Sequence, residues 1–284
     1  MTTPRVWITG AAGLLGSYLL KAAPQFAPAW QPTALRHADL DLCDFAAVRR
    51  RFQAERPDAV IHCAALADTP ICQRDPAAAR RVNVEATRSL AELAADLPLF
   101  FYSTDLVFDG QRGNYAESDA PNPLSTYAET KVAAEQIVLA NPRHTVLRLS
   151  LNFGKSPGGQ RAFNEVLRRD LAAGKNFSLF TDEFRCPTAA LVTAHATWEL
   201  LLQRATGLFH LCGADKLSRW EIAQLLLPHW PGLPGSFQPD SIRNYHGAPR
   251  PPDSSMNCAK VQRLLSFRLP GMAELLAQHP EEVA

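Results

Sequence analysis

The first half of the chain alternates short apolar runs with longer segments in which apolar residues recur every three or four positions. Apolar runs of this length predict β-strands, and the longer period predicts amphipathic helices. Strands are predicted at 5–9, 33–36, 58–63, 98–103 and 145–150, and helices at 13–23, 45–55, 76–96 and 124–140. Strands that alternate with helices through short connections are typical of βαβ units. The sequence therefore predicts an α/β fold with a Rossmann-type, doubly wound parallel sheet.

The pattern changes after about residue 150. Helices are predicted at 161–173, 193–203, 219–227, 258–265 and 271–278, with strand-like segments near 188–192 and at 207–212. Little regular structure is expected in the proline-rich stretch from Pro228 to Pro252. We predict a nucleotide-binding domain over 1–150 and a smaller α/β substrate-binding region over 151–284. No linker-like segment separates the two parts, so they are expected to interleave.

The first predicted strand runs directly into a glycine-rich turn that contains Gly10, Gly13 and Gly16. Glycine allows a tight turn and lets the backbone approach a pyrophosphate closely. The helix that follows offers free N–H groups and the positive end of its dipole to phosphate. The spacing is Gly-x-x-Gly-x-x-Gly and not the commoner Gly-x-Gly-x-x-Gly. We predict a dinucleotide site here, with Leu14 and Leu15 among its contacts.

A tyrosine and a lysine near the middle of the chain form a second chemical signal. Tyr127 and Lys131 lie one turn apart on the same face of a predicted helix. An ammonium beside a phenol favours the phenolate and is expected to lower the tyrosine pKa, which yields a proton donor for use near neutral pH. Most Tyr-x-x-x-Lys pairs are ordinary surface residues, so the glycine-rich turn is what strengthens this reading. Thr104 lies upstream and offers a hydroxyl to polarise a carbonyl.

Composition narrows the class of protein. The 284 residues carry a net charge of +1, which argues against a nucleic-acid partner. The six cysteines are scattered without a Cys-x-x-Cys pair, and the histidines show no metal-ligand spacing, so no metal site is expected. No apolar stretch approaches the roughly twenty residues of a membrane span. The start of the chain lacks the pattern of a signal segment. A cytoplasmic location with reduced thiols is expected.

Three motifs together resemble one family. The run at 103–110 reads Ser-Thr-Asp-Leu-Val-Phe-Asp-Gly, the Tyr-x-x-x-Lys pair is followed by Glu135, and a late Arg-Pro-x-x-Ser element starts at Arg250 and ends at Lys260. They are similar to the extended short-chain dehydrogenases/reductases, and within them to the dTDP-4-dehydrorhamnose reductase family. The resemblance covers nearly the whole chain. It implies an NADPH-dependent reductase that acts on the 4-keto group of a nucleotide-linked deoxysugar, and it leaves a homodimer open.

The resemblance also implies roles for individual residues. Tyr127 would donate the proton to the substrate oxygen, Lys131 would lower its pKa and hydrogen-bond the nicotinamide ribose, and Thr104 would hydrogen-bond the carbonyl. The hydride itself comes from the cofactor. Asn83 matches an asparagine that kinks a helix in this superfamily, and the alternative is a solvated helix residue. Further contacts are implied for the cofactor at Asp41, Leu42, Ala64 and Ala65, and for the substrate at Asp105, Leu106, Phe153 and Arg250.

The choice of cofactor depends on the end of the second predicted strand. An acidic residue there would bind the ribose 2′-hydroxyl of NAD, whereas an arginine accommodates the 2′-phosphate of NADP. Here the strand ends at Arg36 with no acid in register. We therefore expect NADP, with NAD as the other possibility. The alternative is that Arg36 only covers the adenine.

Departures from the family pattern leave alternatives open. Leu106 replaces a tyrosine, and residues 151–154 lack an aromatic pair that usually contacts the sugar, so the exact sugar stays open. A sugar-nucleotide 4,6-dehydratase would need an acid where Leu106 stands, and Arg36 argues against an epimerase that retains NAD. Some relatives, such as the regulatory beta subunit of methionine adenosyltransferase, bind NADP without catalysis. Leu15 and the C-terminal tail lack the acidic residues with which some relatives bind a metal, which again predicts none.

Overall fold

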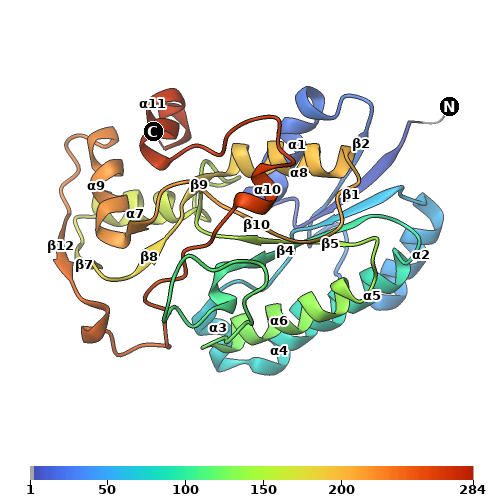
Figure 1. Ribbon diagram of the computed structural model, residues 1–284, viewed down its shortest axis with the longest axis horizontal. Helices are drawn as coiled ribbons and strands as arrows, with labels where there is room; N and C mark the ends of the chain where they lie inside the picture. Colours follow the sequence, from blue (N-terminus) through green and yellow to red (C-terminus); the bar gives the residue numbers. More distant parts are fainter. Residues whose placement is uncertain (1–2, 284) are drawn as a thin grey trace.

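A six-stranded parallel sheet runs through the middle of the protein (Figure 1). The structure is a computed structural model that describes residues 3–283. The strand order is β10–β5–β4–β3–β1–β2, and every neighbouring pair is parallel. The strands are β1 (Arg5–Thr9), β2 (Gln31–Leu35), β3 (Ala59–His62), β4 (Leu99–Thr104), β5 (Thr145–Leu149) and β10 (Gly207–Leu211). The predicted Rossmann-type sheet is confirmed.

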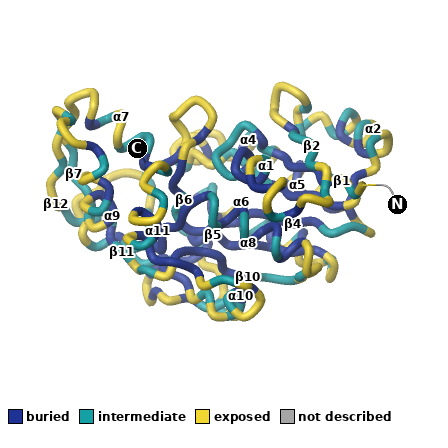
Figure 2. The backbone as a smooth tube through the Cα atoms, turned by 90° about the horizontal axis from the view of Figure 1, so that it is seen from above, coloured by how far each residue is buried: buried dark blue, intermediate teal, exposed yellow. Residues whose placement is uncertain are grey.

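Helices cover both faces of this sheet because successive strand side chains point to opposite faces. Val6 and Ile8 belong to the apolar cluster beneath α1 (Leu14–Phe26) and α8 (Ala190–Leu202). Trp7 lies between them in sequence and belongs to the opposite cluster. The helices on that opposite face are α2 (Phe45–Glu55), α5 (Ala86–Leu93) and α6 (Thr126–Leu139). In Figure 2, where the two helix layers overlap, the backbone of the central strands is coloured mainly as buried and the exposed segments lie mostly at the periphery.

The helix predicted at 76–96 consists of three consecutive pieces. A regular helix, α4 (Pro76–Arg80), leads into a π-helical turn, η1 (Arg81–Glu85), and then into α5. A short helix, α3 (Thr69–Arg74), precedes them. Single π-turns inside helices are frequent at functional sites. Asn83 lies in this turn and is 1% exposed, so the alternative of a solvated helix asparagine is wrong.

The second half builds a smaller layer at one end of the sheet. Its helices are α7 (Phe163–Ala172), α9 (Arg219–Leu226) and α11 (Met272–Gln278), whereas α10 (Ala259–Gln262) packs against β10 of the large sheet. Three two-stranded sheets join them: β6 (Asn152–Phe153) with β9 (Thr188–Ala189), β7 (Asn176–Phe180) with β12 (Ser236–Asp240), and β8 (Phe184–Arg185) with β11 (Leu217–Ser218). Short 3₁₀ turns lie at Asp105–Val107, Leu227–His229, Ile242–Asn244 and Pro280–Glu282.

Two predictions in this region were wrong. The segment at 188–192 is a strand for only two residues, since α8 begins at Ala190. The stretch after Pro228 holds β12, which includes Pro239. β12 pairs on one side only, with β7, and a proline is tolerated at such an edge.

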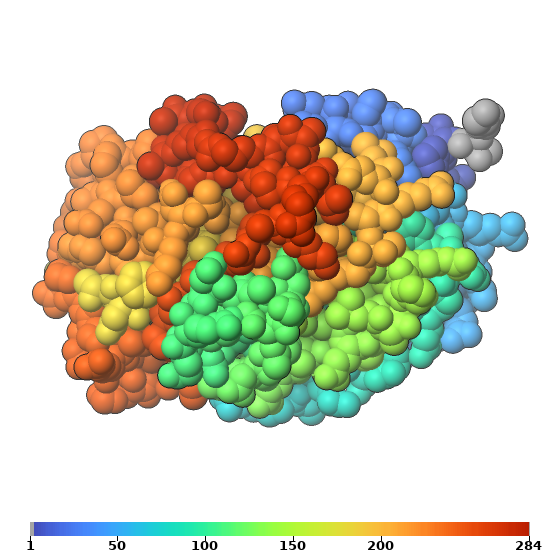
Figure 3. All heavy atoms as spheres, in the orientation of Figure 1, coloured from blue at the N-terminus to red at the C-terminus, as the bar shows by residue number. Residues whose placement is uncertain are grey.

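Segments from the second half return to the large sheet. β10 pairs with β5, and α8 packs on α1. Residue 150 therefore marks a change in sequence pattern and not a boundary in space. In Figure 3 the last part of the chain, in red, lies against both the green segment near residue 110 and the orange elements of the second half. Backbone hydrogen bonds join this segment to other parts of the chain: Tyr115 N–H donates to Ser255 O, and Ser254 N–H donates to Phe184 O. Within residues 3–283, no helix is long and apolar enough to cross a membrane.

Candidate active site

Three adjoining cavities lie at the carboxyl ends of the sheet strands. The central one, of about 690 Å³, borders the glycine-rich turn, the ends of β3 and β4, and α6. A second cavity, of about 360 Å³, shares the turn and extends along the end of β2. A third, of about 320 Å³, shares Thr104 and Tyr127 with the central one. The chain crosses from β2 over β1 to β3, so the cavities lie where ligands bind in doubly wound sheets, at the switch in strand order.

The glycine-rich turn fits a pyrophosphate. Gly10 has a positive φ of 66°, and a Cβ there would lie 2.8 Å from Ala64 N. A Cβ on Gly16 would lie 2.5 Å from Gly10 O, so only glycine lets the helix start so close to the turn. Gly13 caps α1 without a side-chain bond, and the first turn holds no acidic residue. The first N–H groups of α1 therefore remain available to an anion. Leu14 and Leu15 line the cavity beside them.

The second cavity has the residues expected around an adenosine. Asp41, Leu42, Ala64 and Ala65 line it, together with His37. Arg36 does not line it. Its guanidinium Nε lies 2.9 Å from Asp39 Oδ2, and its side chain is 60% exposed. Hydrogen bonds from Arg36 hold the pKa of Asp39 below its usual range. The acid at Asp39 was missed in the sequence because it lies four residues beyond Leu35, the end of β2.

Thr104, Tyr127 and Lys131 meet in the central cavity. Thr104 ends β4, while Tyr127 and Lys131 lie on α6, which Ser125 caps through the Ala128 N–H. Lys131 is 2% exposed, and its Nζ lies 3.9 Å from the centroid of the Phe101 ring. Burial lowers the pKa of Lys131 to about 7. This lysine can therefore gain or lose a proton near neutral pH.

The expected lowering of the tyrosine pKa was wrong for this structure. Burial and then the charge of Asp105 raise the pKa of Tyr127 well above its ordinary value, against the charge of Arg185 and a hydrogen bond with Thr104. Desolvation disfavours the phenolate more than nearby cations favour it. Tyr127 is therefore a protonated phenol at neutral pH, which is the form that a proton donor needs.

The buried charge of Lys131 is expected to lower the free energy of unfolding, and the size of this effect should depend on pH. Its folded pKa of about 7 lies below the ordinary 10.5, so the unfolded chain holds this proton more tightly. The cost is complete below pH 7, where both states are charged, and it disappears as the pH rises towards 10.5. Lys131→Met should melt at a higher temperature than the unaltered protein at pH 6, and the difference should shrink by pH 9. Lys21→Met, which removes an exposed lysine, serves as the control. A difference independent of pH would contradict the prediction.

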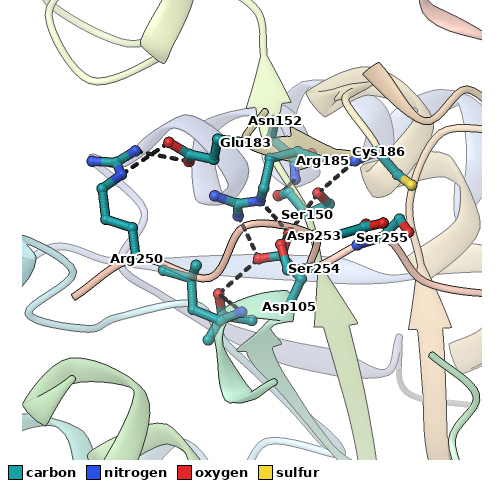
Figure 4. A network of polar contacts seen from close by, with 12 residues as sticks. Asp105, Ser150, Asn152, Glu183, Arg185, Cys186, Arg250, Asp253, Ser254 and Ser255 are labelled. Atoms are coloured by element: carbon teal, nitrogen blue, oxygen red, sulfur yellow. Dashed lines mark hydrogen bonds and ion pairs between the residues drawn. The ribbon is translucent and has the colours of Figure 1, made fainter. Parts of the chain in front are cut away.

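Asp105, the residue after Thr104, is the centre of a buried network of polar contacts (Figure 4). Asp105 is fully buried and forms a bidentate ion pair with Arg185. Its carboxylate also accepts bonds from Ser150 Oγ at 2.7 Å, Ser254 Oγ at 3.2 Å and Thr104 Oγ1 at 3.2 Å. The network joins the end of β4, the residue after β5, β8 and the late Arg-Pro-x-x-Ser segment, and it holds the Thr104 hydroxyl in place.

This burial corrects two expected substrate contacts. Asp105 and Phe153 are each 0% exposed, and neither lines any of the three cavities. The carboxylate oxygens of Asp105 are occupied by bonds from Arg185 and the surrounding hydroxyls, while Phe153 packs in the apolar cluster of the smaller layer. Leu106 and Arg250, by contrast, do line the third cavity.

The third cavity is lined by three arginines that converge on two carboxylates. Arg219 and Arg250 both donate to Glu183. Figure 4 shows the Arg250–Glu183 pair beside the pair of Arg185 with Asp105. Burial would raise the pKa of Glu183, but the charges of Arg219 and Arg250 hold it at about 2. Three guanidinium groups thus face two carboxylates, so this corner carries a net charge of one positive. Arg185 and Arg219 were missed in the sequence, where no motif contains them.

Asn83 joins the π-helical turn to the wall of the central cavity. Its side chain accepts a bond from Leu66 N at 2.8 Å and donates to Leu66 O at 3.0 Å. It also donates to Thr130 Oγ1 on α6 at 3.0 Å. Leu66 lines both the central and the second cavity. Asn83 therefore holds the segment after β3 against the helix that carries Tyr127.

A family model described as the RmlD substrate binding domain matches residues 4–283. The chain belongs to the RmlD substrate binding domain family. The extended short-chain reductase resemblance drawn from its motifs is confirmed by this match. Among solved structures, this RmlD family chain is similar to a hypothetical dTDP-4-dehydrorhamnose reductase from Sulfolobus tokodaii. The two share 30% identity and a TM-score of 0.83, covering 94% of this chain and 97% of the other.

Three further proteins are similar to this RmlD family member. The dTDP-4-dehydrorhamnose reductase of Bacillus anthracis str. Ames, solved in complex with NADP, has a TM-score of 0.89 at 25% identity and covers 99% of this chain and 100% of its own. Methionine adenosyltransferase 2 subunit beta of Mus musculus is 31% identical over 92% of this chain and 82% of its own length. The probable low-salt glycan biosynthesis reductase Agl14 of Haloferax volcanii is 32% identical over 75% of each chain.

Proposed function

We propose that this protein is an NADPH-dependent reductase of the 4-keto group of a nucleotide-linked deoxysugar. The observation that carries the proposal is the continuity of the site. A pyrophosphate-fitting turn, the Thr104–Tyr127–Lys131 group and an arginine-lined cavity follow one another along the sheet edge. Similarity to a dTDP-4-dehydrorhamnose reductase solved with NADP supports the same assignment. We place the reaction in the cytoplasm, where NADPH is supplied.

The residues of the site perform the proton chemistry of such a reduction. When bound, the nicotinamide supplies a hydride to the carbonyl carbon. The Thr104 hydroxyl donates to Asp105 in this structure, and on substrate binding it turns this single proton to the carbonyl oxygen, while Leu106 N–H still donates to Thr104 Oγ1 at 3.2 Å. Tyr127 donates its phenolic proton to that oxygen, which completes the alcohol. Lys131 faces the same cavity, and its ammonium form offsets the negative charge left on the tyrosine.

The third cavity suits the diphosphate of a nucleotide sugar. Arginine presents several N–H donors in a planar fork that matches phosphate oxygens. Arg250 uses Nε and one terminal nitrogen on Glu183, which leaves its other terminal nitrogen for a ligand. Its side chain is 34% exposed, against 2% for Glu183. The net positive charge of this corner favours an anion.

Purified protein tests the proposal directly. NADPH oxidation is followed against a panel of 4-keto deoxysugars linked to dTDP, UDP and GDP, with free 4-keto sugars as the control for the nucleotide. We expect turnover with one nucleotide-linked sugar, dTDP-4-dehydrorhamnose first among them, and none with the free sugars. Failure of every member of the panel would contradict the reductase assignment.

A second candidate function is that of an NADP-binding regulatory subunit. The observation that favours it is the similarity, over 92% of the chain, to subunit beta of methionine adenosyltransferase 2. NADPH binding without any sugar reduction would support this candidate. A dehydratase is disfavoured because Leu106, which lines the third cavity, carries no group that transfers a proton.

Arg36 is predicted to distinguish NADPH from NADH through the 2′-phosphate. Charge-assisted bonds of this kind correspond to roughly a tenfold difference in binding or more. Arg36→Asp should weaken NADPH binding by that factor with little change for NADH. Asp39→Asn frees the same guanidinium and should strengthen NADPH binding. Calorimetric titration with both cofactors measures the effects, and parallel changes for the two cofactors would contradict the role.

A further inference from the structure

A single arginine lies where the central and second cavities meet. The two cavities share the turn residues Gly10 and Gly13 on one side. They also share Arg161, which comes from the loop between β6 and α7 in the second half of the chain. Arg161 thus borders the groove at the level of the glycine-rich turn. No motif in the sequence singles out this residue.

The backbone at Arg161 is held firmly. The Glu165 carboxylate accepts bonds from Ser156 N at 2.7 Å, Arg161 N at 2.9 Å and Ala162 N at 2.9 Å, and from Ser156 Oγ at 2.6 Å. These bonds join the two ends of the 156–161 loop. Its tip carries Gly158 and Gly159, both with positive φ and with open space around them. The backbone of Arg161 is therefore fixed at the base of the loop, whereas the glycines at the loop tip have no packing neighbours.

The side chain of Arg161 has no ion-pair partner among residues 3–283. The residue is exposed. Asp41 and Asp68 also line the two cavities, and Lys131 is buried at the far end near Phe101. Arg161 is thus the cation placed beside the turn, where the N–H groups of α1 supply partial positive charge from the other side.

We propose that Arg161 closes over the pyrophosphate of the dinucleotide from the side opposite the glycine-rich turn. The inference rests on the proposed function for the identity of the ligand. A pyrophosphate carries two negative charges, and the turn alone meets them with backbone dipoles. A guanidinium adds charge-assisted bonds to the same oxygens. Because NADPH and NADH share this group, Arg161 contributes affinity for both, unlike Arg36, which is predicted to contact the 2′-phosphate.

Binding titrations of Arg161→Ala test this assignment. Calorimetry with NADPH, NADH and adenosine is compared with the unaltered protein and with Arg168→Ala, which removes an exposed arginine from α7 that lines neither cofactor cavity. We expect Arg161→Ala to lose roughly tenfold or more for both dinucleotides, a loss of the size that charge-assisted bonds contribute. Adenosine, which has no phosphate, should be unaffected. Arg161→Lys should restore part of the affinity, since lysine keeps the charge without the fork.

Each other outcome overturns the inference. A loss confined to NADPH would move Arg161 to the 2′-phosphate, and unchanged binding of both dinucleotides would remove it from the cofactor site. An equal loss for adenosine would indicate a disturbed fold, which the melting temperature of the variant would show. If the unaltered protein bound neither dinucleotide, the proposed function would fail together with this inference. Unchanged binding in Arg161→Ala alone leaves the proposed function intact.

Discussion

Replacement of Tyr127 by phenylalanine is expected to reduce the turnover number by about 10²–10⁴, the usual contribution of a positioned general acid. The variant keeps the ring and loses only the hydroxyl that donates the proton. NADPH affinity should change little, because the glycine-rich turn and the adenosine cavity are untouched. Burial keeps this phenol protonated at neutral pH, so the donor is present in its active form in the unaltered protein.

The measurement separates binding from chemistry. NADPH affinity is titrated by calorimetry, and NADPH oxidation is followed with whichever 4-keto sugar the panel identifies. Tyr115→Phe is the matched control, since its buried hydroxyl bonds to Asp109 and lines none of the three cavities. Near-normal turnover in Tyr127→Phe would assign the proton donor elsewhere. Equal losses in both variants would indicate a structural effect and not a catalytic one.

The Asp105–Arg185 pair should carry the second large effect, on stability. Arg185→Met leaves the fully buried Asp105 carboxylate without its cation. Removal of one partner from a buried pair costs about 3–5 kcal/mol in the free energy of unfolding. Turnover should fall as well, because the Asp105 carboxylate that holds Thr104 would lose its main partner (Figure 4).

A double replacement distinguishes the pair from its individual charges. Asp105→Leu combined with Arg185→Met removes both charges and should recover most of the lost stability, since apolar groups of similar volume often replace a buried pair without penalty. Turnover should stay low in the double variant, because the Thr104 hydroxyl would still lack the Asp105 carboxylate that positions it. Denaturant unfolding gives the free energies. A surface ion pair contributes about 1 kcal/mol or less. If the single variants lost no more than that in the free energy of unfolding, the Asp105–Arg185 pair would not be effectively buried.

The local parts of the site were predictable from the sequence. The helix at 45–55 and the strand at 5–9 were predicted at their observed bounds. The glycine-rich turn is equally local, since the positive φ of Gly10 and the close contact of Gly16 with Gly10 O both lie within the turn. Apolar periodicity, caps and turn residues act over a few positions, and a sequence displays such signals directly.

The tertiary structure decided what lies far apart in sequence. Arg185 meets Asp105 across 80 residues, and Ser254 reaches the same carboxylate across 149. No local sequence pattern indicates either contact. Asp105 was therefore expected to contact the substrate, whereas in the structure it holds the end of β4 to the smaller layer. Arg161 likewise enters the cofactor groove only because the chain leaves the sheet after β5 and folds back over it. The sequence by itself determined the alternating strands and helices of the first half, the turn and the Tyr127–Lys131 pair, because each depends on neighbouring residues. The packing of the second half onto the first decided which side chains face the cavities and which are buried, because burial depends on contacts that only the completed fold creates.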